Sequence, residues 1–145
     1  MLRIRDEVAN RIRMEGAEAY PHECCGALLG HEREGRRDVA DIMSLTNQRD
    51  DSPRNRFLIT PEDVRTSENA AHRSGLEVLG WYHSHPDAPA KPSEFDREHA
   101  WPWYSYVIVS VQSHVPKEMN SWRLAADRAS YHAEAIEIES HGHAD

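Results

Sequence analysis

The chain has 145 residues, 39% of them hydrophobic, which is enough for one domain whose apolar core needs no disulfides. Its formal net charge is −8, so we expect no nucleic-acid surface, because phosphate binding needs clustered Lys and Arg. No apolar run approaches the length of a membrane helix, and the first residues lack the apolar region of a secretory signal. We therefore expect no membrane span and a cytoplasmic protein.

The first half of the chain is predicted to hold a helix, a hairpin and a third strand. Apolar residues recur at a spacing of four with charged residues between them, which is typical of an amphipathic helix over 2–19. Two strands with a charged turn between them predict a hairpin of 24–29 with 39–45. The polar stretch 46–54 is predicted as a loop, and 57–59 as the third strand.

The second half begins with a sequence Thr-Pro-Glu-Asp, in which a capping threonine and a proline at the first helical position predict a helix over 61–73. The remaining elements, in chain order, are a strand over 76–82, a short helix over 94–100, a buried strand over 104–111 and a closing hairpin of 120–126 with 131–138. This alternation predicts an α/β (α+β) fold, in which a curved mixed or antiparallel sheet is flanked by helices. We expect a single domain over 1–140 and a disordered tail over 141–145.

The most informative stretch is Trp-Tyr-His-Ser-His-Pro at 81–86. Side chains alternate between the two faces of a strand, so His83 and His85 point the same way at the strand's end. Asp96 follows eleven residues after His85, in the first turn of a short helix for which Ser93 is a good N-cap. Two imidazoles and one carboxylate are a common ligand set for catalytic zinc, with the fourth position left for water. The sequence therefore predicts a Zn²⁺ site made of His83, His85 and Asp96.

Other interpretations of this stretch remain open. Asp96 can serve only to complete a capping pattern with Ser93. His99 lies three residues after Asp96 on the same helical face, so His83, His85 and His99 form an alternative ligand trio. Iron or manganese in place of zinc is also compatible with these ligand types.

Cys24 and Cys25 are adjacent, and neighbouring cysteines rarely pair because the ring that they would close is strained. We expect small residues packed in a central strand, with one thiol near the metal site. A Cys-His nucleophile with His22 is one alternative, although nothing nearby supplies an orienting third group. A second zinc site is another, although the stretch offers too few soft ligands.

His83-Ser84-His85-Pro86, six further residues, and then Ser93-Glu94-Phe95-Asp96 resemble the signature H-x-H-P-x6-S-x-x-D of the JAMM (MPN-plus) metalloproteases. That family also carries a glutamate near the start of its first strand, and Glu23 matches this position. The resemblance covers most of the chain. It implies a zinc isopeptidase in which Glu23 is the general base and Ser93 helps to hold the tetrahedral intermediate. From the residues alone, Glu23 is an exposed acid at a strand edge and Ser93 a plain N-cap.

The resemblance also implies a substrate. Family enzymes act on amide or isopeptide bonds at the C-terminal glycines of ubiquitin-like proteins, and the short connections here are similar to those of compact prokaryotic members. We therefore expect a ubiquitin-like or sulfur-carrier protein ending in Gly-Gly, whose extended tail would add to a strand edge. The alternatives are a non-catalytic scaffold of the same fold and a DNA-repair-associated protein with a similar signature. The oligomeric state does not follow from the sequence.

Overall fold

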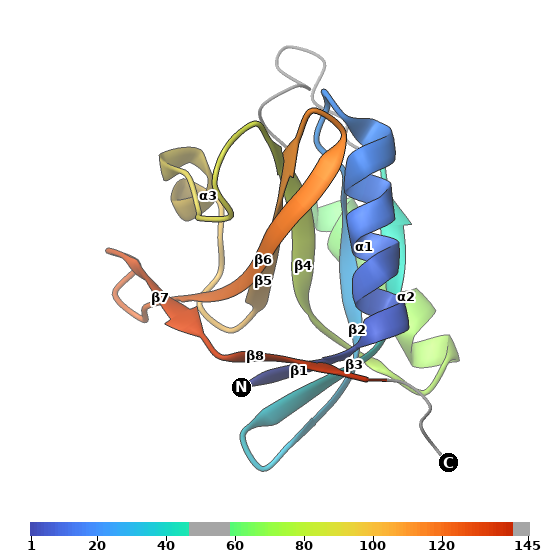
Figure 1. Cartoon of the computed structure of the whole chain (residues 1–145). Helices are drawn as coiled ribbons and strands as arrows, with labels where there is room; N and C mark the ends of the chain where they lie inside the picture. The colour runs from blue at the N-terminus through green and yellow to red at the C-terminus, as the bar shows by residue number, and fades with distance from the viewer. Residues whose placement is uncertain (47–58, 141–145) are drawn as a thin grey trace.

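A single mixed sheet with helices on both faces is seen in the computed structural model, which describes residues 1–46 and 59–140 (Figure 1). The strands are β1 (Leu2–Arg5), β2 (Cys25–Arg33), β3 (Arg36–Leu45), β4 (Glu77–Pro86), β5 (Ser105–Gln112), β6 (Val115–Leu124), β7 (Tyr131–Glu134) and β8 (Ile136–Glu139). The helices are α1 (Asp6–Ala19), α2 (Pro61–Arg73) and α3 (Glu94–Glu98). The predicted fold class, a curved mixed sheet flanked by helices, is confirmed.

The order of strands across the sheet is β7-β6-β5-β4-β2-β3-β1-β8, so β7 and β8 are its two edges. The two edge strands β7 and β8 follow one another in the chain with only Ala135 between them. The backbone N–H of Leu2 in β1 donates to the carbonyl of Ala135 at 2.8 Å, which ties this junction to the sheet. The two edges must therefore lie close together, so the sheet is nearly closed.

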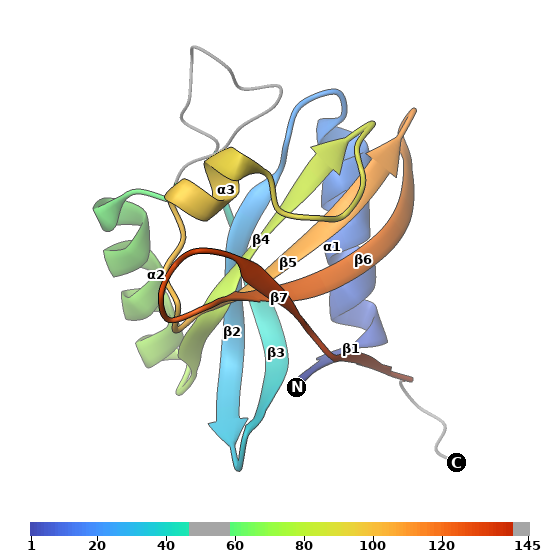
Figure 2. The ribbon, with the colours of Figure 1, turned by 90° about the vertical axis from the view of Figure 1, so that its left-hand side faces the viewer.

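Alternation along β4 divides the apolar residues between two cores. Tyr82 packs in the core under α1, together with Leu28 and Val109. Trp81 points to the opposite face and packs in a second core with residues of α2 and of the chain after α3. Figure 2 shows α1 on the far side of the sheet and α2 and α3 on the other side. His83 and His85 share the face of Trp81, so they point toward α3.

The helix predicted over 2–19 begins only at Asp6, because residues Leu2–Arg5 form β1. β1 pairs in parallel with both β3 and β8. Leu2 and Ile4 alternate into the core and are 0% exposed, whereas Val8 and Ile12 continue the same core at helical spacing. The apolar residues Ile4, Val8 and Ile12 are thus spaced by four although the first of them lies in a strand and the others in a helix. The capped start of α2 is as predicted, with Thr60 and Asp63 in a reciprocal capping box.

The predicted closing hairpin is correct only in part. Residues 121–124 of β6 do pair with β7, but 136–139 leave this hairpin and form β8 beside β1. β6 also begins earlier than predicted, because a tight turn at Ser113 and His114 joins it to β5. Of the predicted strand 57–59 only Ile59 is described, and it is not in a strand. Residues 47–54 of the predicted loop and the tail 141–145 lie outside the described residues.

The parallel pair β4–β5 places the candidate site. Parallel neighbours need a crossover connection, and here residues 87–104 cross from the end of β4 to the start of β5, with α3 in the crossover. The end of β4 also lies beside the start of β2, where Cys25 pairs with His83. The end of β4, the crossover that contains α3 and the start of β2 thus meet at one end of the sheet. None of the helices within 1–46 and 59–140 is long and apolar enough to span a membrane.

Candidate metal centre

His83, His85 and Asp96 bring one ligand atom each to a common point. His83 Nε2 and His85 Nε2 lie 3.0 Å apart, and each lies 3.3 Å from Asp96 Oδ2. Ligands of a tetrahedral Zn²⁺ at about 2.0–2.1 Å lie roughly 3.3–3.4 Å from one another. The three donor atoms therefore have the type and the spacing that a small divalent cation needs.

The orientation of His85 also fits a metal ligand. Its Nδ1 lies 2.9 Å from the carbonyl oxygen of Pro89, which can only accept, so Nδ1 carries the proton. His85 Nε2 then presents a lone pair to the lone pairs of Asp96 Oδ2. Two acceptors at this distance repel unless a proton or a cation lies between them. Metal-binding histidines commonly donate their other N–H to a carbonyl in this way.

Asp96 has two functions, because α3 begins with a reciprocal capping box. Ser93 Oγ accepts from the Asp96 N–H at 3.1 Å, and Asp96 Oδ2 accepts from the Ser93 N–H at 2.8 Å. The same carboxylate oxygen faces the two imidazoles. Capping and metal ligation are therefore compatible at Asp96. Capping uses a lone pair of Ser93 Oγ and leaves its hydroxyl hydrogen available to donate.

Burial and charge set the protonation of the three residues. Burial lowers the pKa of His83 despite the opposing charge of Asp96, which favours the neutral imidazole that a metal needs. Burial alone would raise the pKa of Asp96. The neighbouring imidazoles of His83 and His85 and the hydrogen bond from the Ser93 N–H outweigh it and hold the pKa well below its ordinary value. Asp96 is therefore a carboxylate at neutral pH.

Glu23 precedes β2 and is buried, with 5% of its surface exposed, so the interpretation as an exposed acid is wrong. Together with His85 and Ser93 it lines one open hollow. Burial and then the negative charge of Asp96 raise its pKa to about 9. Among the described residues, Glu23 Oε1 has no hydrogen-bond partner. A desolvated carboxyl group with an unused oxygen thus lines the same hollow as His85.

Sequence reasoning missed how Glu23 is held. The N–H of its neighbour Cys24 donates to Ser84 Oγ at 2.9 Å, and the Ser84 N–H donates to the Cys24 carbonyl at 3.1 Å. Ser84 lies between the two histidines and points to the opposite face of β4. Strand alternation gives that direction, but the partner comes from a distant segment. One residue of β4 therefore ties the Glu23 segment to the ligands.

The two cysteines are free thiols, and Cys25 is buried. Burial raises the pKa of Cys24 to about 12 and raises that of Cys25 further above its ordinary value. A thiol that stays protonated at neutral pH is a poor nucleophile. The packed-residue interpretation is therefore favoured over the Cys-His alternative.

His99 is not brought to the three ligand atoms. Its Nδ1 lies 2.9 Å from the carbonyl oxygen of Phe95, and its ring stacks on the Phe95 ring at 4.1 Å between centroids. His99 instead lines a small hollow behind His83 and Asp96. Within the described part of the chain, His83, His85 and Asp96 are the group of three whose ligand atoms converge. The alternative trio with His99 is not supported.

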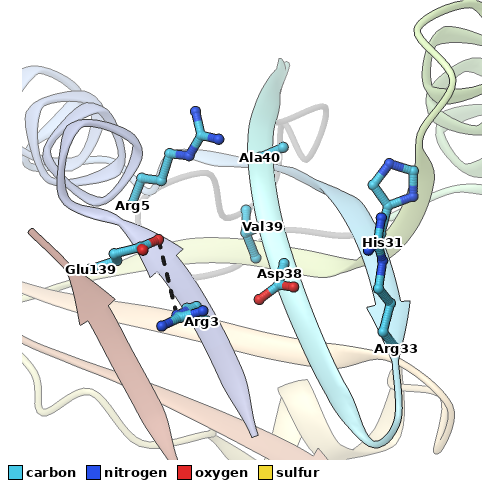
Figure 3. Close-up of a pocket in the computed structure, with 8 residues that line it drawn as sticks. All are labelled: Arg3, Arg5, His31, Arg33, Asp38, Val39, Ala40 and Glu139. Carbon is cyan, nitrogen blue, oxygen red and sulfur yellow. Dashed lines mark ion pairs between the residues drawn. The ribbon is translucent and has the colours of Figure 1, made fainter. Parts of the chain in front are cut away.

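A third hollow lies on β8, β1, β3 and β2, away from these ligands (Figure 3). Three arginines and two acids line it, and Arg3 Nε lies 4.0 Å from Glu139 Oε1. Asp38, which also lines it, pairs with Arg36 at 3.0 Å. The two acids therefore offset only part of the positive charge around this hollow.

The chain is similar in sequence to a known family and to characterised proteins. The family described as prokaryotic homologs of the JAB domain matches residues 5–125. The desampylase of Haloferax volcanii is 35% identical over 107 residues, which are 73% of this chain and 75% of that protein. A probable TtuB-protein conjugate cleaving protease of Thermus thermophilus is 39% identical over 74 residues, which are 51% of this chain and 49% of that protein.

Solved structures agree on the fold. A solution structure of a protein from Salinibacter ruber is 42% identical, covers 96% of this chain and 92% of its own, and has a TM-score of 0.75. A JAB1/MPN domain protein from Archaeoglobus fulgidus is 18% identical, covers 94% of this chain and 97% of its own, and has a TM-score of 0.60. At that identity the second likeness concerns the fold alone.

Proposed function

The chain belongs to the prokaryotic JAB (JAMM/MPN) family, and from this premise we propose that it is a metal-dependent hydrolase of amide or isopeptide bonds at the C-terminal glycines of ubiquitin-like or sulfur-carrier proteins. The observation that carries the proposal is the convergence of His83, His85 and Asp96 at tetrahedral spacing, with Glu23 and Ser93 lining the hollow beside them. The names of the two relatives, a desampylase and a conjugate cleaving protease, support the class of bond.

His83, His85 and Asp96 would hold the metal, and zinc suits two imidazoles and a carboxylate. A bound Zn²⁺ would act as a Lewis acid that activates water, and its positive charge would favour the carboxylate form of Glu23. The hollow leaves the substrate side open, whereas the side toward Trp81 is filled by the buried core. The scissile bond is therefore expected to approach past Glu23 and Ser93.

Glu23 supplies proton transfer. Its free oxygen accepts a proton from the attacking water, and the same carboxyl group delivers that proton to the leaving nitrogen as the C–N bond breaks. The products are the carrier's C-terminal carboxylate and a free amine. Desolvation suits this role because it brings the pKa of the carboxyl group closer to that of the groups with which it exchanges protons.

Ser93 supplies a donor for the developing oxyanion. Its hydroxyl group is exposed and needs only a lone pair for capping, so the hydrogen can point into the hollow. Such a donor stabilises the negative charge that develops in the transition state and lowers the activation barrier by roughly 2.7–4 kcal/mol. Rigid attachment to the start of α3 fixes its position relative to Asp96.

The test uses a ubiquitin-like carrier joined through its terminal glycine either to an acceptor lysine or to cysteine. Mass spectrometry in water enriched in heavy oxygen should show the label in the carrier's new carboxylate, and EDTA should abolish its appearance. Glu23→Gln should retain the metal and lose turnover, while Glu77→Gln on the exposed end of β4 serves as the matched control. Label incorporation that EDTA leaves unchanged would refute metal-dependent hydrolysis.

The non-catalytic scaffold and the DNA-repair-associated protein remain the alternatives. A scaffold would need no metal, so a purified chain that takes up no zinc under excess would favour it. The net charge of −8 offers no support for a DNA-binding role.

A further inference from the structure

The segment from Asp87 to Ala90, which leaves β4 directly after the histidines, is anchored by other strands. Asp87 turns the chain out of β4 with a φ of 54°, and its N–H donates to the Val111 carbonyl at 2.7 Å. Ser110 Oγ on β5 donates to the carbonyl of Ala88. The first half of this segment is therefore fixed to β5.

The second half is fixed to β6 through both the N–H and the carbonyl of Ala90, and the N–H donates to Glu118 Oε2 at 3.4 Å. The oxygen of Ala90 accepts from Trp122 Nε1 at 3.0 Å and from Asn120 Nδ2 at 3.2 Å. A carbonyl oxygen has two lone pairs, so these two side chains use both. Ala90 itself is 0% exposed, which leaves no room for water to replace either donor.

Pro89 lies between these two anchored residues, and its carbonyl accepts from His85 Nδ1. The proline ring fixes its own φ, and the anchored neighbours restrict the peptide groups on either side. The Pro89 oxygen therefore cannot turn away unless the bonds to Ala88 or Ala90 break. Its direction determines which nitrogen of His85 carries the proton and where the other nitrogen points.

We propose that Trp122 and Asn120 are positioning residues of the metal centre. By holding Ala90 they keep the Pro89 carbonyl where it fixes the tautomer and the direction of His85. The inference rests on the proposed function, since it concerns the same centre. Neither side chain is one of the three ligands, so their effect passes through backbone alone. Partners that orient a ligand in this indirect way typically change metal affinity by about 10–100-fold.

The test compares Trp122→Phe and Asn120→Leu, singly and together, with wild type. Each change removes the donor and keeps much of the side-chain volume. Trp103→Phe is the matched control, because it removes the same indole N–H from a side chain that is 59% exposed. Circular dichroism and urea unfolding establish that each variant is folded, and if the double variant does not fold, the two single variants decide.

Two readouts are used, and neither depends on turnover. Zinc affinity, measured by competition with a chromophoric chelator, should weaken by about 10-fold in each single variant and further in the double variant, and stay unchanged in Trp103→Phe. A nitrogen–proton correlation spectrum of the metal-free protein should show His85 protonated at Nδ1 in wild type and a mixture of tautomers in the variants.

Unchanged zinc affinity together with an unchanged His85 tautomer in folded variants would overturn the inference. If wild type cleaves carrier conjugates and the variants match it in both readouts, the inference alone falls. If wild type binds zinc but cleaves no conjugate, the proposed function falls, and the affinity and tautomer measurements still decide the positioning role. A wild type that binds no zinc and shows no preferred tautomer would refute both.

Discussion

Removing the buried carboxyl group of Glu23 should change how the stability of the metal-free protein depends on pH. The pKa of this group is 4.5 when it is solvated and about 9 in the fold, because burial and the charge of Asp96 oppose ionisation. Between these values the folded chain holds a proton that the unfolded chain has lost. The unfolding free energy therefore falls as pH rises through this range.

The magnitude follows from the same two values. One bound proton corresponds to about 1.4 kcal/mol per pH unit, and proton uptake at this site is nearly complete between pH 5 and pH 7. Glu23 should thus lower the unfolding free energy by about 2.5 kcal/mol over these two units. Glu23→Gln removes this contribution, so the difference between variant and wild type should grow by about that amount.

Urea unfolding in the presence of EDTA, followed by circular dichroism at several pH values, measures this difference. Glu77→Gln controls for the loss of a carboxylate in general, because Glu77 is exposed. Parallel profiles for wild type and Glu23→Gln between pH 5 and pH 7 would refute the reasoning. They would mean that the Glu23 carboxyl group is solvated, and its proposed role in proton transfer would lose its physical basis.

Three further predictions concern the same end of the sheet. Ser93→Ala should lower stability by about 1 kcal/mol through loss of the cap and should also lower kcat by about 10²–10³-fold. Thr60→Ala, which removes the equivalent cap of α2, should lower stability alone. Equal kcat values for the two variants would exclude an oxyanion role for Ser93. Gly26→Ala should destabilise the fold by about 1–3 kcal/mol, because a Cβ there would lie 2.4 Å from ring atoms of Tyr82; thermal unfolding checks this, and an unchanged midpoint contradicts it. Dialysis against EDTA should abolish conjugate cleavage, and added zinc should restore it in wild type but not in Asp96→Ala. Metal analysis measures how much zinc each protein retains, and full zinc content in Asp96→Ala would exclude Asp96 as a ligand.

The ligand stretch could be predicted because its geometry is local. Strand alternation alone places His83 and His85 on one face, and the pattern Ser-x-x-Asp alone predicts the capping box that positions Asp96. The resemblance to a known signature added Glu23. The burial of Glu23 did not follow from its own neighbours, because the residues around it lie at the end of β4 and in 88–93, distant in the sequence.

The elements that escaped prediction depend on partners distant in the chain. Leu2 and Ile4 fit the start of a helix by spacing, but β3 and β8 offer pairing on both sides, so the chain there is extended. The local pattern of Ile136–Glu139 favours a continuation of the preceding hairpin, because nothing local in the sequence shows that the sheet curls until its edges meet. The bonds to Ser84 Oγ and the Pro89 oxygen were missed for a related reason, since neither acceptor is a residue type that signals a metal site.

The short helix α3 has a consequence for how a cation and the fold depend on each other. Five residues are far too few for a helix that is stable alone, since isolated helices below about 12 residues are marginal in water. Its first turn is closed by Asp96 Oδ2, the oxygen that also faces both imidazoles. Ordering of this turn and occupancy of the centre are thus linked equilibria, and each must strengthen the other by the same factor. A mutation that frays α3, even at a residue remote from the imidazoles, would therefore act as a metal-affinity mutation.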